Sequence, residues 1–175
     1  MNSRILKYGS SILRQQSAEV TNNDDVSALV HSLFEVLSKE GGVGLAAPQI
    51  GILKQVFVID TSSMANDYKV GSNARRVIIN PIIITQSDEA NIYKEGCLSF
   101  PNIFEEIIRP EKIVVRYFDE QLNQVEQEFN DIDARVFQHE FDHLNGILFI
   151  DRISKLRRTM IAGKLKRITR SSKNA

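Results

Sequence analysis

Hydrophobic residues first recur in a regular pattern between residues 25 and 39. Apolar side chains stand there every three or four positions, at Val26, Leu29, Val30, Leu33 and Leu37. This spacing predicts an amphipathic helix, and Asp24 or Asp25 just before it can cap its first turn. A shorter helix is predicted at about residues 11–15.

The middle of the chain carries short runs rich in β-branched and aromatic residues, bounded by polar residues or turn formers. They predict strands at 55–60, 77–85, 92–99, 105–109, 112–119 and 124–130. A helix follows, begun by Asn130 or Asp131 and closed by Gly146. This helix is apolar on two sides, so we expect it to be buried in the middle of an α+β fold, with antiparallel β-sheets packed around it.

The last 24 residues differ from the rest in charge. They hold nine Lys or Arg and no acid, whereas the first 151 residues hold 13 bases and 22 acids. Apolar residues recur among the bases at roughly helical spacing, which predicts a basic amphipathic helix over residues 155–170. Its expected apolar stripe is Ile153, Leu156, Met160, Ile161, Leu165 and Ile168. The basic face is either simply solvated or contacts nucleic acid.

Length and composition suggest one ordinary globular domain over residues 1–175, with 42% hydrophobic and 25% charged residues. No apolar stretch approaches the roughly 20 residues that span a bilayer, and the N-terminus lacks the apolar core of a signal peptide. One cysteine precludes an internal disulfide. We therefore expect a cytoplasmic protein with no membrane partner and no DNA partner.

The predicted central helix carries the sequence QHEFDHLNG, in which His139 and His143 stand one turn apart on one face. Two imidazoles need a third ligand to make a catalytic metal site. No histidine follows His143, no glutamate follows Glu140, and Asp151 is the only later acid, so the third ligand must lie upstream. The single cysteine, Cys97, is the best candidate, although a lone cysteine is more often a small buried hydrophobe.

A glycine-rich segment, GVGLAAPQIG at residues 42–51, loosely fits a dinucleotide-binding fingerprint. That fingerprint needs a strand before the glycines and a helix after them. Here a helix is predicted before the segment and a strand after it, so the nucleotide interpretation is rejected.

Three segments together resemble the peptide deformylases: the loop Gly42–Gln49, the strand end Glu95–Ser99 and the helix Gln138–Gly146. The resemblance spans most of the chain. It implies hydrolysis of the formyl group from the N-terminal formylmethionine of new polypeptides in a bacterial cytoplasm, with the ribosome surface as a partner for the basic helix. It also implies one Fe²⁺ per chain, which zinc or nickel replaces in purified protein. The Cys-His-His donors would suit zinc equally, so the sequence leaves the metal open.

The resemblance also implies roles for individual residues. Glu140 would take a proton from water and deliver it to the leaving amine, while the Leu98 N–H and Gln49 would stabilise the oxyanion. Gln49 has a simpler alternative as a turn residue. The expected walls of the substrate pocket are Val43, Gly44, Ile132 and Val136.

Glu95 and Arg109 have supporting roles by the same resemblance, and Arg109 would pair with Asp142 and hold the helix. The alternative for Arg109 is an exposed charge. The chain departs from common relatives at Ser10 and Ser11, and at Phe104 and Arg135 near the expected substrate groove. Two rival functions are a general HExxH metallopeptidase and an inactive ribosome-binding module.

Overall fold

A computed structural model describes residues 4–66 and 74–173. Within them, seven strands form two antiparallel sheets, one of five strands in the order β1-β2-β3-β6-β7 and one of two, β4-β5. The strands are β1 (Gly44–Ala46), β2 (Val56–Asp60), β3 (Arg75–Gln86), β4 (Ala90–Cys97), β5 (Phe100–Pro110), β6 (Lys112–Phe118) and β7 (Gln124–Asn130). The helices are α1 (Val26–Glu40), α2 (Asp131–Leu144) and α3 (Lys155–Lys173), with short 3-10 turns at Ser11–Arg14, Ala47–Ile50, Ser62–Met64 and Phe149–Asp151.

The five-stranded sheet separates two hydrophobic clusters, because side chains alternate between its faces. In β2, Phe57 and Ile59 belong to the cluster that contains α2, whereas Val56 and Val58 belong to the cluster that contains α1. The Asp25 side chain caps α1 by accepting the Ala28 N–H, as predicted. The two helices therefore pack on opposite faces of the same sheet.

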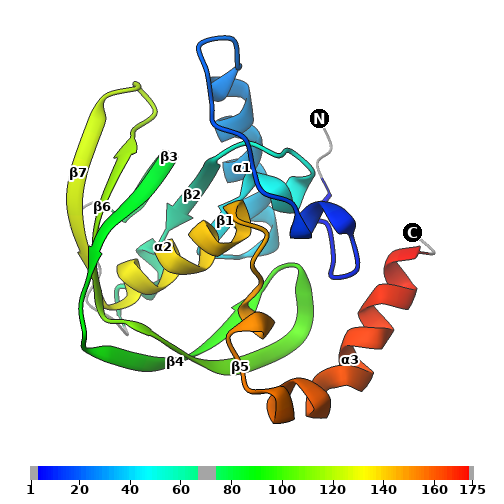
Figure 1. The fold of residues 1–175 in the computed structure, drawn as a ribbon. Helices are drawn as coiled ribbons and strands as arrows, with labels where there is room; N and C mark the ends of the chain where they lie inside the picture. The colour runs from blue at the N-terminus through cyan, green and yellow to red at the C-terminus, as the bar shows by residue number, and fades with distance from the viewer. Residues whose placement is uncertain (1–3, 67–73, 174–175) are drawn as a thin grey trace.

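Helix α2 lies in the centre of the molecule, between the five-stranded sheet and the β4-β5 hairpin (Figure 1). Every residue of α2 except Asp131 and Phe141 is buried. Gly146 closes the helix in a left-handed conformation, with φ of +68°. The predicted α+β fold with a central buried helix is confirmed, and polar side chains on α2 must find their partners inside the protein.

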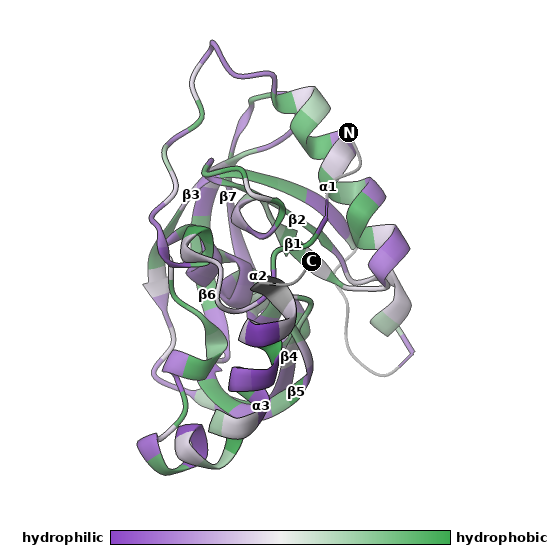
Figure 2. Ribbon diagram, turned by 90° about the vertical axis from the view of Figure 1, so that its right-hand side faces the viewer, coloured by the Kyte–Doolittle hydropathy of each residue, from purple (hydrophilic) through white to green (hydrophobic). Residues whose placement is uncertain are grey.

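Helix α3 packs on a third cluster, formed with the N-terminal segment, β5 and residues 148–150. Ile161 and Leu165 are buried in it, and Figure 2 shows the mainly hydrophilic colouring of the rest of the helix. The predicted apolar stripe was wrong at Leu156 and Met160, which are 72% and 67% exposed. The side chains of Leu156 and Met160 face solvent, although the first turns of α3 contact β5 through the Arg157–Glu105 ion pair. The helix also runs to Lys173, beyond the expected end at residue 170.

Two local predictions need correction. The segment predicted as a helix near residues 11–15 is one 3-10 turn, Ser11–Arg14, and the glycine-rich segment contains a strand, β1, followed by another 3-10 turn. Strand β1 has only three residues, too few to show an alternating pattern, and it forms because it pairs with β2 from Gly44–Ile59 to Ala46–Phe57. Pairing with a distant strand, rather than a local sequence pattern, therefore determines β1.

Candidate metal centre

Three segments distant in the sequence meet beside α2. The glycine-rich segment supplies β1 and the 3-10 turn that contains Gln49, the end of β4 supplies Cys97, and α2 supplies both histidines. The β4-β5 pairing shifts register between Gly96 and Cys97, so that Cys97 pairs with Phe100 next to a tight turn. This irregular strand end brings the thiol to the helix.

The side chains of Cys97, His139 and His143 form a cluster whose ligand atoms all lie within 4.8 Å of one another. Cys97 Sγ is 3.3 Å from His143 Nε2, and the two imidazole centroids are 5.2 Å apart. One sulfur and two imidazole nitrogens at this separation match the donor set of a mononuclear transition-metal site. The three residues that sequence reasoning chose as ligands are therefore brought together.

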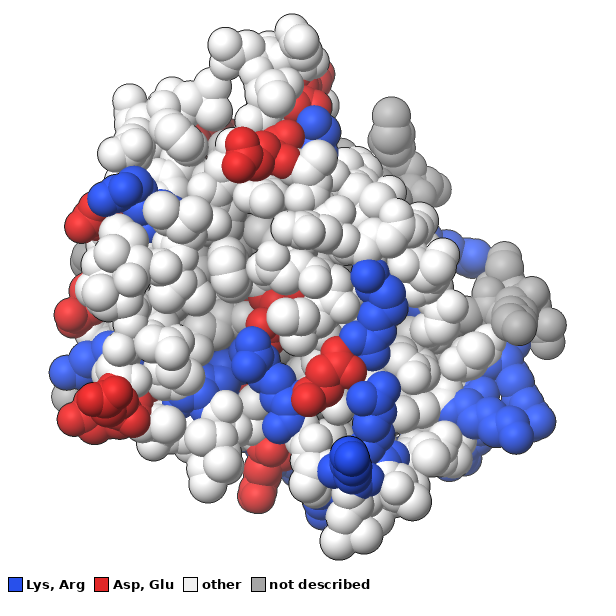
Figure 3. Space-filling model, in the orientation of Figure 1, with Lys and Arg blue, Asp and Glu red and all other residues white. Residues whose placement is uncertain are grey.

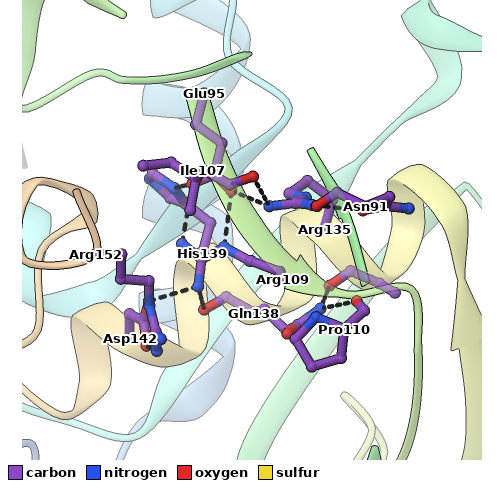
Figure 4. Close-up of polar contacts among 11 residues, drawn as sticks. Asn91, Glu95, Ile107, Arg109, Pro110, Arg135, Gln138, His139, Asp142 and Arg152 are labelled. Carbon is purple, nitrogen blue, oxygen red and sulfur yellow. Dashed lines mark hydrogen bonds and ion pairs between the residues drawn. The ribbon is translucent and has the colours of Figure 1, made fainter. Parts of the chain in front are cut away.

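Glu95 connects His139 to a buried charge network, drawn in Figure 4. Its Oε2 lies 2.9 Å from His139 Nδ1, and its carboxylate also accepts hydrogen bonds from Arg109 and from Arg135. Burial alone raises the pKa of this carboxyl group, but the hydrogen bonds from Arg109 and His139 outweigh it and hold the pKa well below its usual value. An ionised Glu95 fixes the His139 ring with Nε2 directed at the cluster.

Arg109 is almost completely buried between β5 and α2, which excludes the alternative of an exposed charge. Its Nη1 donates to Asp142 Oδ2 at 2.7 Å, the pair expected from the sequence, and Asp142 also pairs with Arg152. Sequence reasoning missed the role of Arg135 in this network. Its guanidinium is held by Glu95 and the Asn91 carbonyl. Arg135 stands four residues before His139, on the same face of the helix, and this spacing could have indicated its place in the network.

Gln49 is buried and lies against the cysteine. Its Oε1 accepts the Ala46 N–H at 2.8 Å, which orients the amide, and its Nε2 is 3.5 Å from Cys97 Sγ and 3.3 Å from Ser99 Oγ. The hydrogen bond to Ala46 closes the 3-10 turn, so Gln49 is a turn residue that also presents an amide to the site. Ser99 was not recognised as its partner from the sequence.

Glu140 is 4% exposed, and its Oε2 has no hydrogen-bond partner among the described residues. Burial, with a smaller contribution from the Glu95 charge, raises the pKa of Glu140 to about 7, against the opposing charge of His139. A Cβ at position 44 would lie 2.5 Å from Glu140 Oε1 and 2.9 Å from Val136 Cγ1. Gly44 therefore gives the carboxylate its space.

A cavity of about 560 Å³ opens over Cys97, His139 and Glu140. All the residues predicted as pocket walls line this cavity, namely Val43, Gly44, Ile132 and Val136. Gln49 and Leu98 line it as well. Phe104 and Arg135 line it too, but Arg135 is buried and tied into the Glu95 network, whereas Phe104 is exposed. The cavity is mostly apolar around a few converging polar groups, as small-molecule sites usually are.

In this α+β fold, a thiol and two imidazoles lie beside a buried carboxylate and a mostly apolar cavity, and one carboxylate oxygen has no hydrogen-bond partner among the described residues. This arrangement is typical of mononuclear metal-dependent hydrolases. The sequence profile of the Polypeptide deformylase family matches residues 2–159. The chain belongs to this family, whose members are metal-dependent hydrolases that remove the formyl group from the N-terminus of new peptides.

Individual peptide deformylases are similar to this protein over most of the chain. A peptide deformylase of Pseudothermotoga lettingae is 43% identical over 98% of this chain and 95% of its own length. A crystal structure of the Plasmodium falciparum enzyme has a TM-score of 0.88 at 37% identity, covering 98% of both chains. The structure of the Thermotoga maritima enzyme has a TM-score of 0.78 at 42% identity, covering 87% of this chain and 97% of its own. Among the described residues, none of the helices has the length and apolar character needed to cross a bilayer.

Proposed function

We propose that this deformylase, one domain over residues 1–175, works in a bacterial cytoplasm on N-formylmethionyl polypeptides at the cavity above Cys97. Cys97, His139 and His143 hold one Fe²⁺, for which zinc or nickel substitutes in purified protein. The observation that carries the proposal is the buried Glu140 carboxylate, which lines the same cavity as Cys97 and His139 and has one oxygen without a hydrogen-bond partner among the described residues. When bound, the ion supplies Lewis acidity, which activates water and polarises the formyl carbonyl at neutral pH.

Glu140 is the proton carrier in this mechanism. Its carboxylate takes a proton from the attacking water and delivers it to the amine nitrogen as the formyl C–N bond breaks. Gly44 leaves no side chain between the carboxylate and the cavity.

Gln49 and the backbone N–H of Leu98 stabilise the oxygen on which negative charge develops. The Gln49 amide is pre-oriented by its bond to Ala46, so little reorganisation is needed when the charge appears. Val43, Ile132 and Val136 provide the apolar slot for the methionine side chain. Formyl is the smallest acyl group, so a tight fit around it would exclude larger ones by shape.

The substrate test compares three peptides of identical sequence, carrying formyl-Met, acetyl-Met or free Met at the N-terminus. Protein is prepared anaerobically with added Fe²⁺, and released amine and formate are measured. We expect release only from the formyl peptide. Cleavage of internal bonds in the unblocked peptide would favour a general metallopeptidase, and no reaction at all would favour a ribosome-binding module.

Glu140→Gln separates metal binding from chemistry. The amide keeps the size of the side chain but cannot carry a proton, so metal content should persist while kcat falls by about 10²–10⁴. The matched control is Glu106→Gln, an exposed carboxylate on β5 outside the cavity. Near wild-type kcat in metal-loaded Glu140→Gln would refute the proposed role.

The ribosome surface is the proposed partner of α3. Ile161 and Leu165 of α3 are buried, so deleting the helix would expose the hydrophobic cluster on which they pack, and charge removal at exposed positions is the cleaner test. The triple variant Lys155→Gln/Lys166→Gln/Arg170→Gln should reduce ribosome association in a salt-dependent way and leave hydrolysis of a free formyl peptide intact. Equal binding at low salt would reject this partner.

A further inference from the structure

A second cavity, of about 590 Å³, lies beside the cavity of the metal centre. It is lined by Lys7, Pro101, Asn102, Lys164, Arg167, Ile168 and Ser171. Lys7, Pro101 and Asn102 also line the cavity of the metal centre, so the two hollows share a wall. A peptide that extended from the first cavity along this wall would reach the second.

The shared wall exists because β5 is irregular next to Cys97. Gly96 pairs with Phe104, but the next residue, Cys97, pairs with Phe100, so residues 101–103 of β5 have no partner on β4. Asn102 has φ of +58°, a left-handed conformation that Asn tolerates better than most residues. The same irregularity therefore places the thiol at the metal centre and directs Pro101 and Asn102 to both cavities.

Lys7 is fixed at the junction of the two cavities. Its Nζ donates to the Leu98 carbonyl at 2.9 Å, and the N–H of the next residue, Tyr8, donates to the Ser99 carbonyl at 2.9 Å. Both bonds go to the turn that follows Cys97. The ammonium group is thereby held half-buried beside the site, which reduces the entropy lost when it binds a ligand.

The other two bases of the second cavity come from α3, which packs closely on the N-terminal segment. A Cβ at Gly9, which has φ of +105°, would lie 2.9 Å from Thr169 Cγ2, so only glycine allows this approach. Figure 1 shows the blue N-terminal segment beside the red α3, and Figure 3 shows Lys and Arg gathered where α3 lies. This packing sets Lys164 and Arg167 opposite Lys7.

All the charged residues that line the second cavity are basic. No acidic residue lines it, and within residues 4–66 and 74–173 none of Lys7, Lys164 and Arg167 makes an ion pair. Earlier in the same helix, by contrast, Arg157 pairs with Glu105 and Arg158 pairs with Asp151. Three uncompensated cations around one hollow produce a positive potential that attracts a carboxylate.

We propose that the second cavity is a substrate subsite, in which Lys7, Lys164 and Arg167 bind an acidic side chain of the peptide downstream of its formylmethionine. The inference rests on the proposed function of the first cavity, because the shared wall matters only if the peptide starts there. A peptide side chain suits a hollow that shares lining residues with that cavity. A nucleic-acid backbone would instead bind the outer face of α3, where Lys166 and Arg170 lie exposed.

The test uses short formyl-Met peptides of equal length, in which one Glu is moved through successive positions after the methionine, each with a Gln counterpart. The ratio of kcat/KM for Glu over Gln is measured at low and high ionic strength. We expect a preference for Glu of about two- to tenfold at one or two adjacent positions, weakened by salt as expected for partly exposed charge pairs.

Two variants locate the preference. Lys164→Gln/Arg167→Gln should bring the Glu/Gln ratio close to one, whereas Lys166→Gln/Arg170→Gln, which changes equal charge on the same helix outside the cavity, should retain the wild-type ratio. A ratio of one at every position in the wild type, or equal loss of preference in both variants, overturns the subsite while the proposed function stands. No turnover of any formyl peptide overturns the proposed function and the subsite together.

Discussion

Replacing Glu95 by Gln tests whether the buried charge network beside the metal centre stabilises the folded protein. The Glu95 carboxylate accepts hydrogen bonds from Arg109 Nε at 2.7 Å and Nη2 at 2.9 Å and from Arg135 Nη1 at 2.8 Å, and it meets His139 Nδ1 at 2.9 Å. Gln keeps the shape but turns one acceptor into an NH₂ group that faces other donors. It also leaves Arg135 without a carboxylate partner among the described residues.

The expected cost follows from burial. Removing one partner of a buried ion pair costs about 3–5 kcal/mol, since the remaining charge stays desolvated. Arg109 keeps Asp142, which limits the loss to this range even though several hydrogen bonds are affected. For a chain of 175 residues, about 2–4 °C of melting temperature accompanies each kcal/mol. We therefore expect Glu95→Gln to lower the Tm by roughly 6–20 °C.

The assay is urea denaturation and calorimetry of chelator-treated protein, so that metal binding does not contribute. The matched control is Glu126→Gln on β7. The side chain of Glu126 is 52% exposed and pairs at 2.8 Å with Arg116, itself 43% exposed. An exposed pair contributes about 0–1 kcal/mol. If Glu95→Gln lost no more stability than Glu126→Gln, the stabilising role of the buried network would be refuted.

Three further predictions concern the site and its surroundings. Cys97→Ala should strip the metal, and full occupancy by elemental analysis would reject the ligand set. Gly44→Ala should lower kcat/KM at least tenfold by displacing Glu140, and unchanged kinetics would refute that steric argument. Burial raises the pKa of Asp151, but hydrogen bonding, mainly from Arg14, lowers it below the usual 3.8. Asp151→Asn should therefore be less stable than the wild type at pH 7, and this difference should vanish as the pH falls through the lowered pKa. Acid denaturation of both proteins checks this prediction.

The candidate ligands were accessible from the sequence because two of them share one helical motif and the third is the only residue of its type. His139 and His143 stand one helical turn apart, and the only cysteine leaves one thiolate donor. The central helix was predicted to be buried because apolar residues occupy two of its sides, and α2 is buried as expected. Periodicity over a dozen residues suffices for such inferences, since the repeat itself specifies which face meets the core.

Other features depend on contacts between distant segments, which no local pattern encodes. Strand β1 is defined by its pairing with β2. The role of Arg135 depends on Glu95 and Asn91, which lie far from it in the sequence and bind its guanidinium in the fold. Leu156 and Met160 fit an apolar stripe by their spacing, yet they are exposed, because tertiary packing sets which turns of α3 meet the core.

The sequence by itself indicated the candidate metal ligands, the buried helix and the family resemblance, because these depend on residue types within short motifs and on the single cysteine of the chain. Only the tertiary structure decided the position of the basic cavity. Lys7 is separated from Lys164 and Arg167 by most of the chain, and these residues meet because Gly9 lets α3 approach the N-terminal segment. Packing over such separations results from the summed burial of the whole core, which short-range spacing does not specify.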